Sequence, residues 1–301
     1  MTKINYSIII PHKNTPMLLQ RCLDSIPRRN DIQIVVIDDN SDPDKVDFAQ
    51  FPCLNDPSIE IVFTKEGRGA GYARNIGLKK AAGKWILFSD ADDYFLDNFL
   101  NYTDKYIDSN YDLIYFGIKR IGKKKEKKNM VYKKNNKFID AAIHNKNIDA
   151  YKYTAYSPWG KMIKKQLIVD NSIFFDETLV ANDRMFSLKT AYYAKNIFFE
   201  TDIIYVYNPE ESCLTNLQSV YTNFIRFTVY VRTNDFLNQI GQEMYNVNLV
   251  QPLLKLVNIR NCHFFFKALA IIKKKKINLF REFYCYIKMI LNRTGKKSCK
   301  E

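Results

Sequence analysis

Residues 85–93 read WILFSDADD, an apolar run that stops abruptly at a cluster of aspartates. The same order recurs at residues 32–42, IQIVVIDDNSD, where Val35, Val36 and Ile37 follow one another without alternation. Such uninterrupted apolar runs are typical of strands that are buried on both faces. Because the carboxyl ends of parallel strands meet at one edge of a sheet, we expect both acidic clusters to converge on one crevice, although they are far apart in the chain.

Strands and helices alternate over the first 116 residues. The predicted strands span residues 6–10, 32–37, 59–63, 85–89 and 113–116. Pro11 closes the first of them, and Thr15 and Pro16 signal the start of a helix. A second helix is expected over about residues 72–82, ending at Gly83. This order predicts an α/β fold with a mainly parallel, mixed sheet flanked by helices, which binds ligands beyond the carboxyl ends of its strands.

The remainder of the chain differs in character. A lysine-rich stretch at residues 119–137 is expected to form a loop or a flexible hairpin. Helices are predicted near residues 161–169 and 183–194, with a strand near 203–206. From about Tyr221 onward the chain is rich in aromatic, aliphatic and lysine residues, and we expect it to be helical. The predicted division is therefore an α/β domain at 1–216 and a helical, basic and aromatic extension at 217–301.

The composition limits the class of protein. Apolar residues make up 47% of the 301 residues and charged residues 26%, which excludes a disordered or fibrous chain. No apolar run approaches the roughly 18 residues that cross a bilayer, and no secretory signal is present, so we expect a cytoplasmic protein. Six cysteines and three histidines show no disulfide or zinc-ligand spacing.

The positive charge is local. The net charge of +14 arises from +9 at residues 119–137 and +11 at residues 251–301, which leaves −6 on the other 231 residues. A local basic patch suits an anionic surface, either phosphates or lipid headgroups. The aromatic and basic tail at 251–301 could lie on the inner face of the cell membrane, or it could pack its aromatics on the α/β domain and leave its lysines in water.

Three motifs carry candidate chemistry. Asp90 and Asp92, separated by one residue at a strand end, suit Mg²⁺ bound to a diphosphate, although such triplets also form solvated turns or helix caps. Asp39 could accept hydrogen bonds from a base or ribose, and the alternative is an ordinary Asx turn. The glycines of residues 67–77 let the backbone approach a ligand and Arg74 offers a fork to phosphate, but the segment could instead be a closely packed helix start.

Four motifs in order resemble family 2 glycosyltransferases of the GT-A fold from bacterial capsule and lipopolysaccharide synthesis. They are SIIIP at 7–11, IDDNS at 37–41, ARNIG at 73–77 and AGKWILFSDADD at 82–93. The resemblance extends more loosely through WGK at 159–161, FDE at 175–177 and NDRMF at 182–186, and reaches about residue 216. Two positions depart from the family pattern: Asn182 stands where many relatives have glutamate, and HKN at 12–14 replaces the usual Val-Tyr-Asn.

The resemblance implies an inverting transfer of a sugar from a nucleotide-diphosphate donor, with UDP the commonest nucleotide, to a glycan or lipid-linked acceptor of a surface polysaccharide. It implies that Asp183 is the base that deprotonates the acceptor hydroxyl. Asp92 and Asp90 would hold Mg²⁺ or Mn²⁺ on the diphosphate. The nucleotide-binding residues would be Pro11, His12, Asn14, Asp39, Arg74 and Asp90, with Lys161 and Trp159 near the diphosphate or acceptor.

Simpler roles remain open for some of these residues. Arg74 could pair with an acid on its own helix, Lys161 could be a solvated charge beside a packed Trp159, and Asp183 could complement a helix dipole. Asn182 also leaves open a noncatalytic protein that binds sugar nucleotides or glycans. A nucleic-acid binder is a third hypothesis, but the sequence contains no recognised nucleic-acid module and we expect no nucleic-acid partner.

Overall fold

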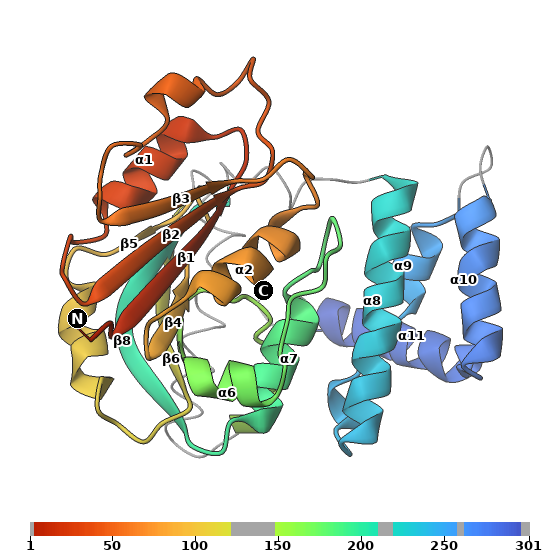
Figure 1. Cartoon of the computed structure of the whole chain (residues 1–301). Coiled ribbons are helices and arrows are strands. Elements are labelled where there is room, and N and C mark those ends of the chain that lie inside the picture. The colour runs from red at the N-terminus through yellow and green to blue at the C-terminus, as the bar shows by residue number, and fades with distance from the viewer. Residues whose placement is uncertain (1–2, 122–147, 210–218, 258–261, 296–301) are drawn as a thin grey trace. The chain divides into compact units, whose positions relative to one another are not determined.

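The computed structural model describes residues 3–121, 148–209, 219–257 and 262–295 (Figure 1). The chain divides into two compact units, Met1–Thr215 and Asn216–Glu301. The predicted loop at 119–137 lies outside the described residues, except that Lys119 and Arg120 end a strand.

An eight-stranded sheet forms the centre of the first unit, with strand order β3-β2-β1-β4-β7-β6-β8-β5. The strands are β1 (Tyr6–His12), β2 (Ile32–Asp38), β3 (Ile59–Phe63), β4 (Trp85–Phe88), β5 (Tyr94–Phe95), β6 (Leu113–Arg120), β7 (Lys161–Lys164) and β8 (Ile197–Tyr207). Six strands run in one direction, whereas β7 and β5 are antiparallel to their neighbours. The predicted mixed, mainly parallel sheet is therefore confirmed.

Two strand predictions were wrong in detail. Residues 161–164, expected to open a helix, form β7 between β4 and β6, because Met162 and Ile163 are fully buried there. Pro11 does not end β1. The backbone N–H of Ser89 donates to the carbonyl of Ile9, on the edge of β1 that faces β4. Pro11 lies two residues further along and therefore faces the same edge. Because β4 has already ended there, the N–H that proline lacks is not needed for a hydrogen bond in the sheet.

Helices cover both faces of this sheet (Figure 1). They are α1 (Pro16–Asp24), α2 (Ala70–Lys80), α3 (Phe99–Thr103), α5 (Ile148–Lys152), α6 (Lys165–Asp170) and α7 (Arg184–Tyr193), with short 3₁₀ turns at Phe48–Gln50 and Asp104–Tyr106. Along β1, Ile8 and Ile10 pack into one core with α1, while Ile9 faces a second core that contains Phe186 of α7. The middle of each central strand is therefore continuously apolar, as in Ile8–Ile10 of β1 and Ile34–Ile37 of β2, which is typical of covered parallel strands.

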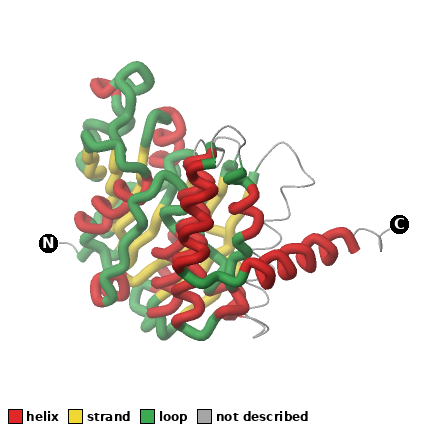
Figure 2. Tube along the Cα trace, turned by 90° about the vertical axis from the view of Figure 1, so that its right-hand side faces the viewer, coloured by secondary structure: helices red, strands yellow, loops and turns green. Residues whose placement is uncertain are grey.

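The second unit is helical, as predicted. It consists of α8 (Val220–Gln239), a 3₁₀ turn at Glu243–Tyr245, α9 (Val250–Leu254), α10 (His263–Lys274) and α11 (Leu279–Gly295). Figure 1 labels these four α-helices, and Figure 2 draws helices in red. Ser219 and Thr222 form a capping box at the start of α8. Phe227, Leu253 and Ile272 belong to a small core of its own. Within the described residues, every helix is too short or too polar to cross a bilayer.

Gly77 provides a test of how α2 packs on the sheet. A Cβ on Gly77 would lie 2.4 Å from Cγ2 of the buried Ile9. Gly77→Ala should therefore lower the free energy of unfolding by about 1–3 kcal/mol through overpacking, although alanine favours an exposed helix by about 1 kcal/mol. Chemical denaturation measures this change. The exposed Lys79→Ala on the same helix is the control, and a stabilised Gly77→Ala protein would contradict the packing.

Candidate active site

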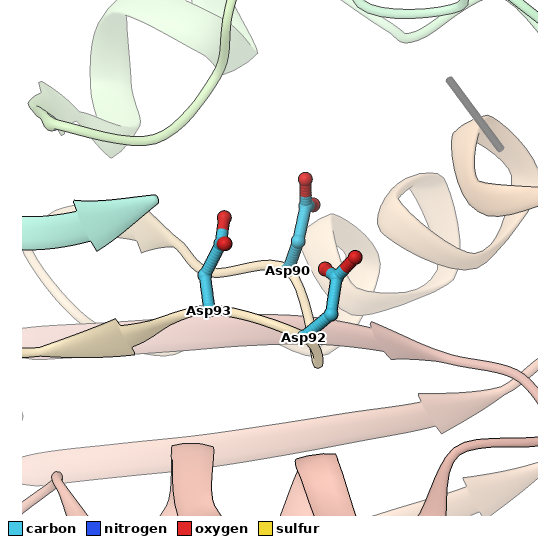
Figure 3. A group of neighbouring side chains, drawn as sticks. All are labelled: Asp90, Asp92 and Asp93. Carbon is cyan, nitrogen blue, oxygen red and sulfur yellow. The ribbon is translucent and has the colours of Figure 1, made fainter. Parts of the chain in front are cut away.

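Three aspartates gather directly after β4 (Figure 3). One carboxylate oxygen each of Asp90, Asp92 and Asp93 lies within 4.8 Å of the others. Asp90 and Asp92 are half-buried, whereas Asp93 is fully buried. Carboxylate oxygens at this spacing are the hard ligands that Mg²⁺ and Mn²⁺ prefer, so this donor set fits the cation that the sequence predicted.

Asp93 differs from the other two because both of its oxygens bond to the protein. Tyr205 of β8 donates its hydroxyl to Oδ2 at 2.8 Å, and the backbone N–H of Asn208 donates to Oδ1 at 2.7 Å. Burial, together with the charges of Asp90 and Asp92, raises the pKa of Asp93 to about 8. Asp93 therefore positions the loop, and the prediction that Asp90 and Asp92 bind a cation stays a prediction.

Tyr205 joins the loop after β4 to the distant strand β8. Besides binding Asp93, its hydroxyl accepts the backbone N–H of Asp90 at 3.0 Å. Trp159 stacks on the Tyr205 ring at 5.3 Å and on Tyr207 at 5.0 Å. Trp159 thus packs on two tyrosines of β8, and its predicted contact with diphosphate or acceptor stays a prediction.

Removing the Tyr205 hydroxyl tests this link. Tyr205→Phe leaves the buried Asp93 without one donor, so we expect a loss of about 1–3 kcal/mol in the free energy of unfolding. Tyr193→Phe, at a half-exposed position on α7, is the matched control. Equal stabilities of the two variants in urea unfolding would show that the hydroxyl does not hold the loop.

Arg74 of α2 connects two segments that are far apart in the chain. Its Nη2 lies 2.5 Å from Oδ1 of Asp90, and its Nη1 donates to Oδ1 of Asn182 at 2.9 Å. The guanidinium also lies over the ring of Phe175, at 5.3 Å. Arg74 is 5% exposed. The alternative that it pairs with an acid on its own helix is therefore wrong, and Arg74 holds Asp90 and Asn182 together.

The segment that carries Asp183 is fixed on α2 by the neighbours of Arg74. The Asn75 side chain exchanges two hydrogen bonds with the backbone of Phe175, at 2.8 and 3.0 Å. A Cβ on Gly71 would lie 2.0 Å from the carbonyl oxygen of Asp176. The Ala-Arg-Asn-Ile-Gly motif therefore acts as a docking surface for residues 175–182, as well as a helix start.

Asp183 lies at the start of α7 and is partly buried. Within the described residues, its side chain makes no capping hydrogen bond to the helix, so the dipole-capping alternative has no direct contact to support it. Burial raises the pKa of this carboxyl group, and the positive charge of Arg74 opposes the rise. A carboxylate with an elevated proton affinity is suited to accept a proton.

Lys161, the first residue of β7, is 3% exposed. Its Nζ donates to the carbonyl of Ala155 at 2.8 Å and lies 5.2 Å from the centre of the Tyr115 ring. Burial lowers the pKa of Lys161 to about 7, and the charge of Asp183 opposes this shift. The solvated-charge alternative is therefore wrong. A direct contact of Lys161 with diphosphate stays a prediction, because its ammonium group is directed into the protein.

The buried lysine predicts a pH-dependent effect. Between about pH 7 and 10 the unfolded chain binds a proton on this lysine that the folded chain does not, so stability rises with pH through this window. Lys161→Met removes the cost of the buried charge, and the difference in unfolding free energy should favour the variant most below about pH 7, by up to roughly 5 kcal/mol. It should shrink toward pH 10. A difference that is constant across this range in urea unfolding would contradict the assignment.

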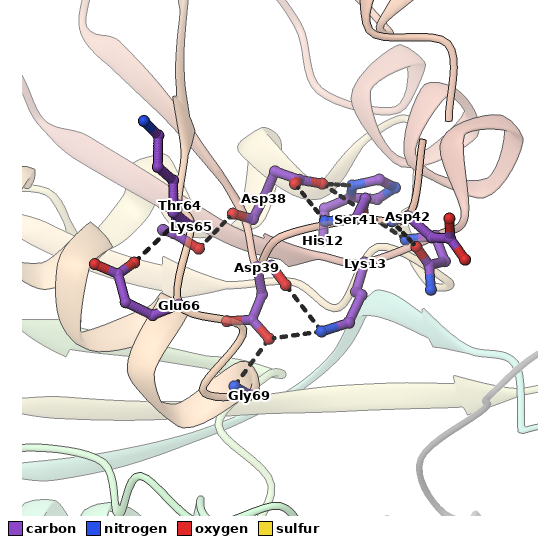
Figure 4. Close-up of polar contacts among 11 residues, drawn as sticks. His12, Lys13, Asp38, Asp39, Ser41, Asp42, Thr64, Lys65, Glu66 and Gly69 are labelled. Atoms are coloured by element: carbon purple, nitrogen blue, oxygen red, sulfur yellow. Dashed lines mark hydrogen bonds and ion pairs between the residues drawn. The ribbon is translucent and has the colours of Figure 1, made fainter. Parts of the chain in front are cut away.

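A second polar cluster lies at the ends of β1 and β2 (Figure 4). Asp38 accepts bonds from His12 at 2.8 Å and from the backbone and hydroxyl of Ser41 at 2.9 and 2.6 Å. Asp39 Oδ2 accepts from the backbone N–H of Gly69 at 2.8 Å and lies 3.4 Å from Lys13 Nζ. Asp38 forms the Asx turn, whereas Asp39 holds the glycine-rich segment, and the predicted contact of Asp39 with a base or ribose stays a prediction.

Asp39 retains one unused acceptor. Its Oδ1 is buried and has no hydrogen-bond partner among the described residues. Buried polar atoms are nearly always paired in native proteins, so an unpaired carboxylate oxygen indicates that a partner is missing. A ligand hydroxyl or ring N–H would satisfy it.

His12 does not match the predicted nucleotide contact. Its Nδ1 bonds to Asp38, and its Nε2 accepts the backbone N–H of Thr15 at 3.1 Å, so both nitrogens are used within the protein. Asn14 is likewise tied to the same turn, because its Oδ1 accepts from Asp42 at 2.7 Å and its backbone N–H donates to Ser41 at 2.8 Å. Pro11 is buried within β1. These residues shape the loop, while Lys13 reaches Asp39.

Sequence reasoning missed two site residues. Tyr205 was predicted only as part of a strand, and Asn75 only as part of a motif. Nothing local to Tyr205 marks it, because its partners lie 112 and 115 positions away. Two surface hollows of about 350 and 410 Å³ are not lined by Asp39, Asp90, Asp92 or Asp183, although Asn75 and Asp176 line the second.

This geometry agrees with comparisons to known proteins. The sequence model of glycosyl transferase family 2 matches residues 7–170, and the chain belongs to this family. It is 29% identical over 208 residues to the poly(ribitol-phosphate) beta-glucosyltransferase of Bacillus spizizenii, and the aligned region covers 67% of this chain and 32% of that protein. It is 26% identical over 212 residues to the poly(ribitol-phosphate) beta-N-acetylglucosaminyltransferase TarS of Staphylococcus aureus, covering 68% of this chain and 35% of TarS. The chain thus spans about a third of the length of these relatives.

Solved structures share the fold. The S. aureus TarS fragment 1–349 in complex with UDP-GlcNAc aligns with a TM-score of 0.61 and 22% identity, covering 87% of this chain and 73% of that one. The mannosyltransferase PcManGT of Pyrobaculum calidifontis, in complex with GDP-Man and Mn²⁺, aligns with a TM-score of 0.55 and 15% identity, covering 96% of this chain and 81% of that one. The first unit therefore has the GT-A fold that the sequence predicted.

Proposed function

We propose that this chain transfers a sugar from a nucleotide-diphosphate donor, a UDP-sugar, to a hydroxyl group of a surface polysaccharide or cell-wall polymer. Family membership and fold support this reaction class. The single observation that carries the proposal is the Arg74 bridge, because it brings the Asp90 loop and the Asn182-Asp183 segment to one edge of the sheet.

The proposed donor site lies between the two polar clusters. The unpaired Oδ1 of Asp39 would accept a hydrogen bond from the nucleoside. Lys13 Nζ, which is 45% exposed at its side chain and lies beside Asp39, offers a cation at the same edge. UDP is proposed because the TarS fragment has been solved with UDP-GlcNAc.

The proposed cation site consists of Asp90 and Asp92, which would hold Mg²⁺ or Mn²⁺. When bound, the cation supplies charge neutralisation for the diphosphate leaving group. Arg74 keeps Asp90 in place through one carboxylate oxygen, and Asp93 and Tyr205 fix the backbone of the same loop. The protein therefore positions this carboxylate pair from two sides.

Asp183 is the proposed general base. Its carboxylate would take the proton of the acceptor hydroxyl as that oxygen bonds to the anomeric carbon, while the bond to the nucleotide diphosphate breaks. A single displacement of this kind inverts the anomeric configuration. The raised pKa of Asp183 brings its proton affinity closer to working pH than that of an ordinary aspartate.

Asn182 does not by itself favour a noncatalytic protein. Asn182 is 7% exposed. Its side chain accepts a hydrogen bond from Arg74 and donates one to the carbonyl of Thr178 at 3.3 Å. An amide at this position therefore links the loop internally, and it leaves Asp183 as the carboxylate proposed for proton transfer.

Asp183→Asn tests catalysis separately from binding. We expect kcat/KM to fall by about 10²–10⁴-fold, because the proton acceptor is lost. Thermal stability should not fall: the raised pKa means that the buried charge costs stability at neutral pH, and that cost disappears with asparagine. Release of UDP from UDP-sugars in the presence of Mn²⁺ and a polyol-phosphate polymer measures turnover.

Binding is followed by thermal shift with UDP-sugars, with and without Mn²⁺. Asp183→Asn should keep the ligand-induced shift, Asp92→Asn should lose its Mn²⁺-dependent part, and Asp108→Asn, at a largely exposed side chain, is the control for both assays. Nucleotide binding without turnover in the wild type would instead identify a noncatalytic binder.

A further inference from the structure

The helix α11 carries an apolar stripe on its outer side. Phe280 is 91% exposed and Tyr284 is 67% exposed. The stripe consists of Phe280, Phe283, Tyr284 and Ile287, all of which are exposed. Their spacing of three and four residues places them on one side of the helix, within an arc of roughly 100° at 100° per residue. Four large apolar side chains exposed on one helix face indicate a binding surface.

The opposite side of α11 is fixed within the second unit. Glu282 accepts from the backbone N–H of Leu249 at 2.9 Å and from the Asn248 side chain at 3.1 Å, and its carbonyl accepts from Asn248 at 2.8 Å. Leu279, at the border of the stripe beside Phe283, packs against the core that contains Leu253. These contacts set the rotation of α11, so the helix cannot turn its stripe into the core of its own unit without breaking them.

The charges around the stripe are positive. Glu282 is the one acidic residue at positions 263–295, and its carboxylate is bound on the inner side. Arg281 and Lys288 are exposed on α11 at one border of the stripe, and the exposed lysines at 273–276 precede the helix, with Lys275 paired to Asp235. Residues 216–301 contain 15 Lys or Arg and 4 Asp or Glu, a net charge of +11.

The structure also narrows what the sequence indicated for the tail. Phe264 lies against Phe224 of α8 at a ring distance of 5.1 Å, and Phe265 packs against the core of the second unit. The aromatic run at the start of α10 is therefore partly used inside the unit. The outward apolar surface belongs to α11.

We propose that the outer face of α11 binds the surface of an anionic lipid bilayer, with the stripe in the acyl boundary and the flanking lysines and arginine at the headgroups. An amphipathic helix with a cationic border has this mode of binding. A second copy of this chain fits less well, because two stripes in contact would bring like charges together. The proposal goes beyond sugar transfer and does not depend on it.

Sedimentation of the full chain with vesicles tests this proposal. The protein should bind vesicles of equal parts phosphatidylcholine and phosphatidylglycerol, and binding to phosphatidylcholine alone should be weaker. Raising the salt from about 0.1 M to about 0.5 M should weaken binding to the anionic vesicles. The double variant Phe280→Ser, Ile287→Ser should lose about tenfold or more in vesicle affinity, because two large apolar side chains no longer insert.

Met244→Ser is the matched control, since Met244 is 78% exposed in the same unit but lies outside α11, and its vesicle affinity should equal that of the wild type. Circular dichroism and sugar transfer should be unchanged in all variants. Equal vesicle binding by the double variant and the wild type would overturn the proposal. Failure of the wild type to bind vesicles would also overturn it. A dimer that light scattering detects for the wild type but not for the double variant would then identify a second copy of the chain as the partner. Binding to oligonucleotides alone would identify a nucleic acid as the partner. If the double variant melts at a lower temperature than the wild type and the wild type does not bind vesicles, another part of the chain covers the stripe. This result would equally overturn the proposal.

Discussion

The site depends on the buried guanidinium of Arg74. A buried charge is tolerated only with partners of good geometry, and Arg74 has them in Asp90 on one side and Asn182 on the other. Its planar fork can reach both at once, which the single ammonium group of a lysine does less well. The loop after β4 and the start of α7 are thus held in one geometry by a side chain from a third element, α2. The arrangement of Asp90 relative to Asp183 follows from this bridge.

Around this bridge, most polar residues of the edge bind one another. His12, Asp38, Ser41 and Asn14 form a closed set of hydrogen bonds that shapes the turn after β2. Asp93 and Tyr205 do the same below the aspartate loop. Among the described residues, what is left over is small: one oxygen of Asp39, the second oxygen of Asp90 and the carboxylate of Asp183. A site built in this way holds a few reactive groups on a rigid support, which is how positioned groups become effective.

The sequence was most informative where structure is local. The apolar runs ending in aspartate predicted β2 and β4 and placed their acidic residues at one edge. This succeeded because a buried strand and the turn that follows it depend on residues that are neighbours in the sequence. It failed at residues 161–164, because KMIK has neither length nor alternation, and its strand conformation depends on pairing with β4 and β6. Tyr205 could not be found for the same reason, since its role is set by residues on the far side of the sheet. The resemblance identified Arg74 as a site residue, but only the coordinates show that it bonds to Asn182.

The position of β7 has a consequence for how the chain acquires its structure. β4 and β6 do not pair with each other in the described sheet, and the four residues of β7 lie between them. During synthesis the first four strands can pair, but the two halves of the sheet cannot join until residues 161–164 have left the ribosome. Until then β4 and β6 each present an unpaired edge, the kind of surface on which partly made chains associate. The short strand β7, which is synthesised after β1–β4 and β6, is thus needed to join them into one sheet.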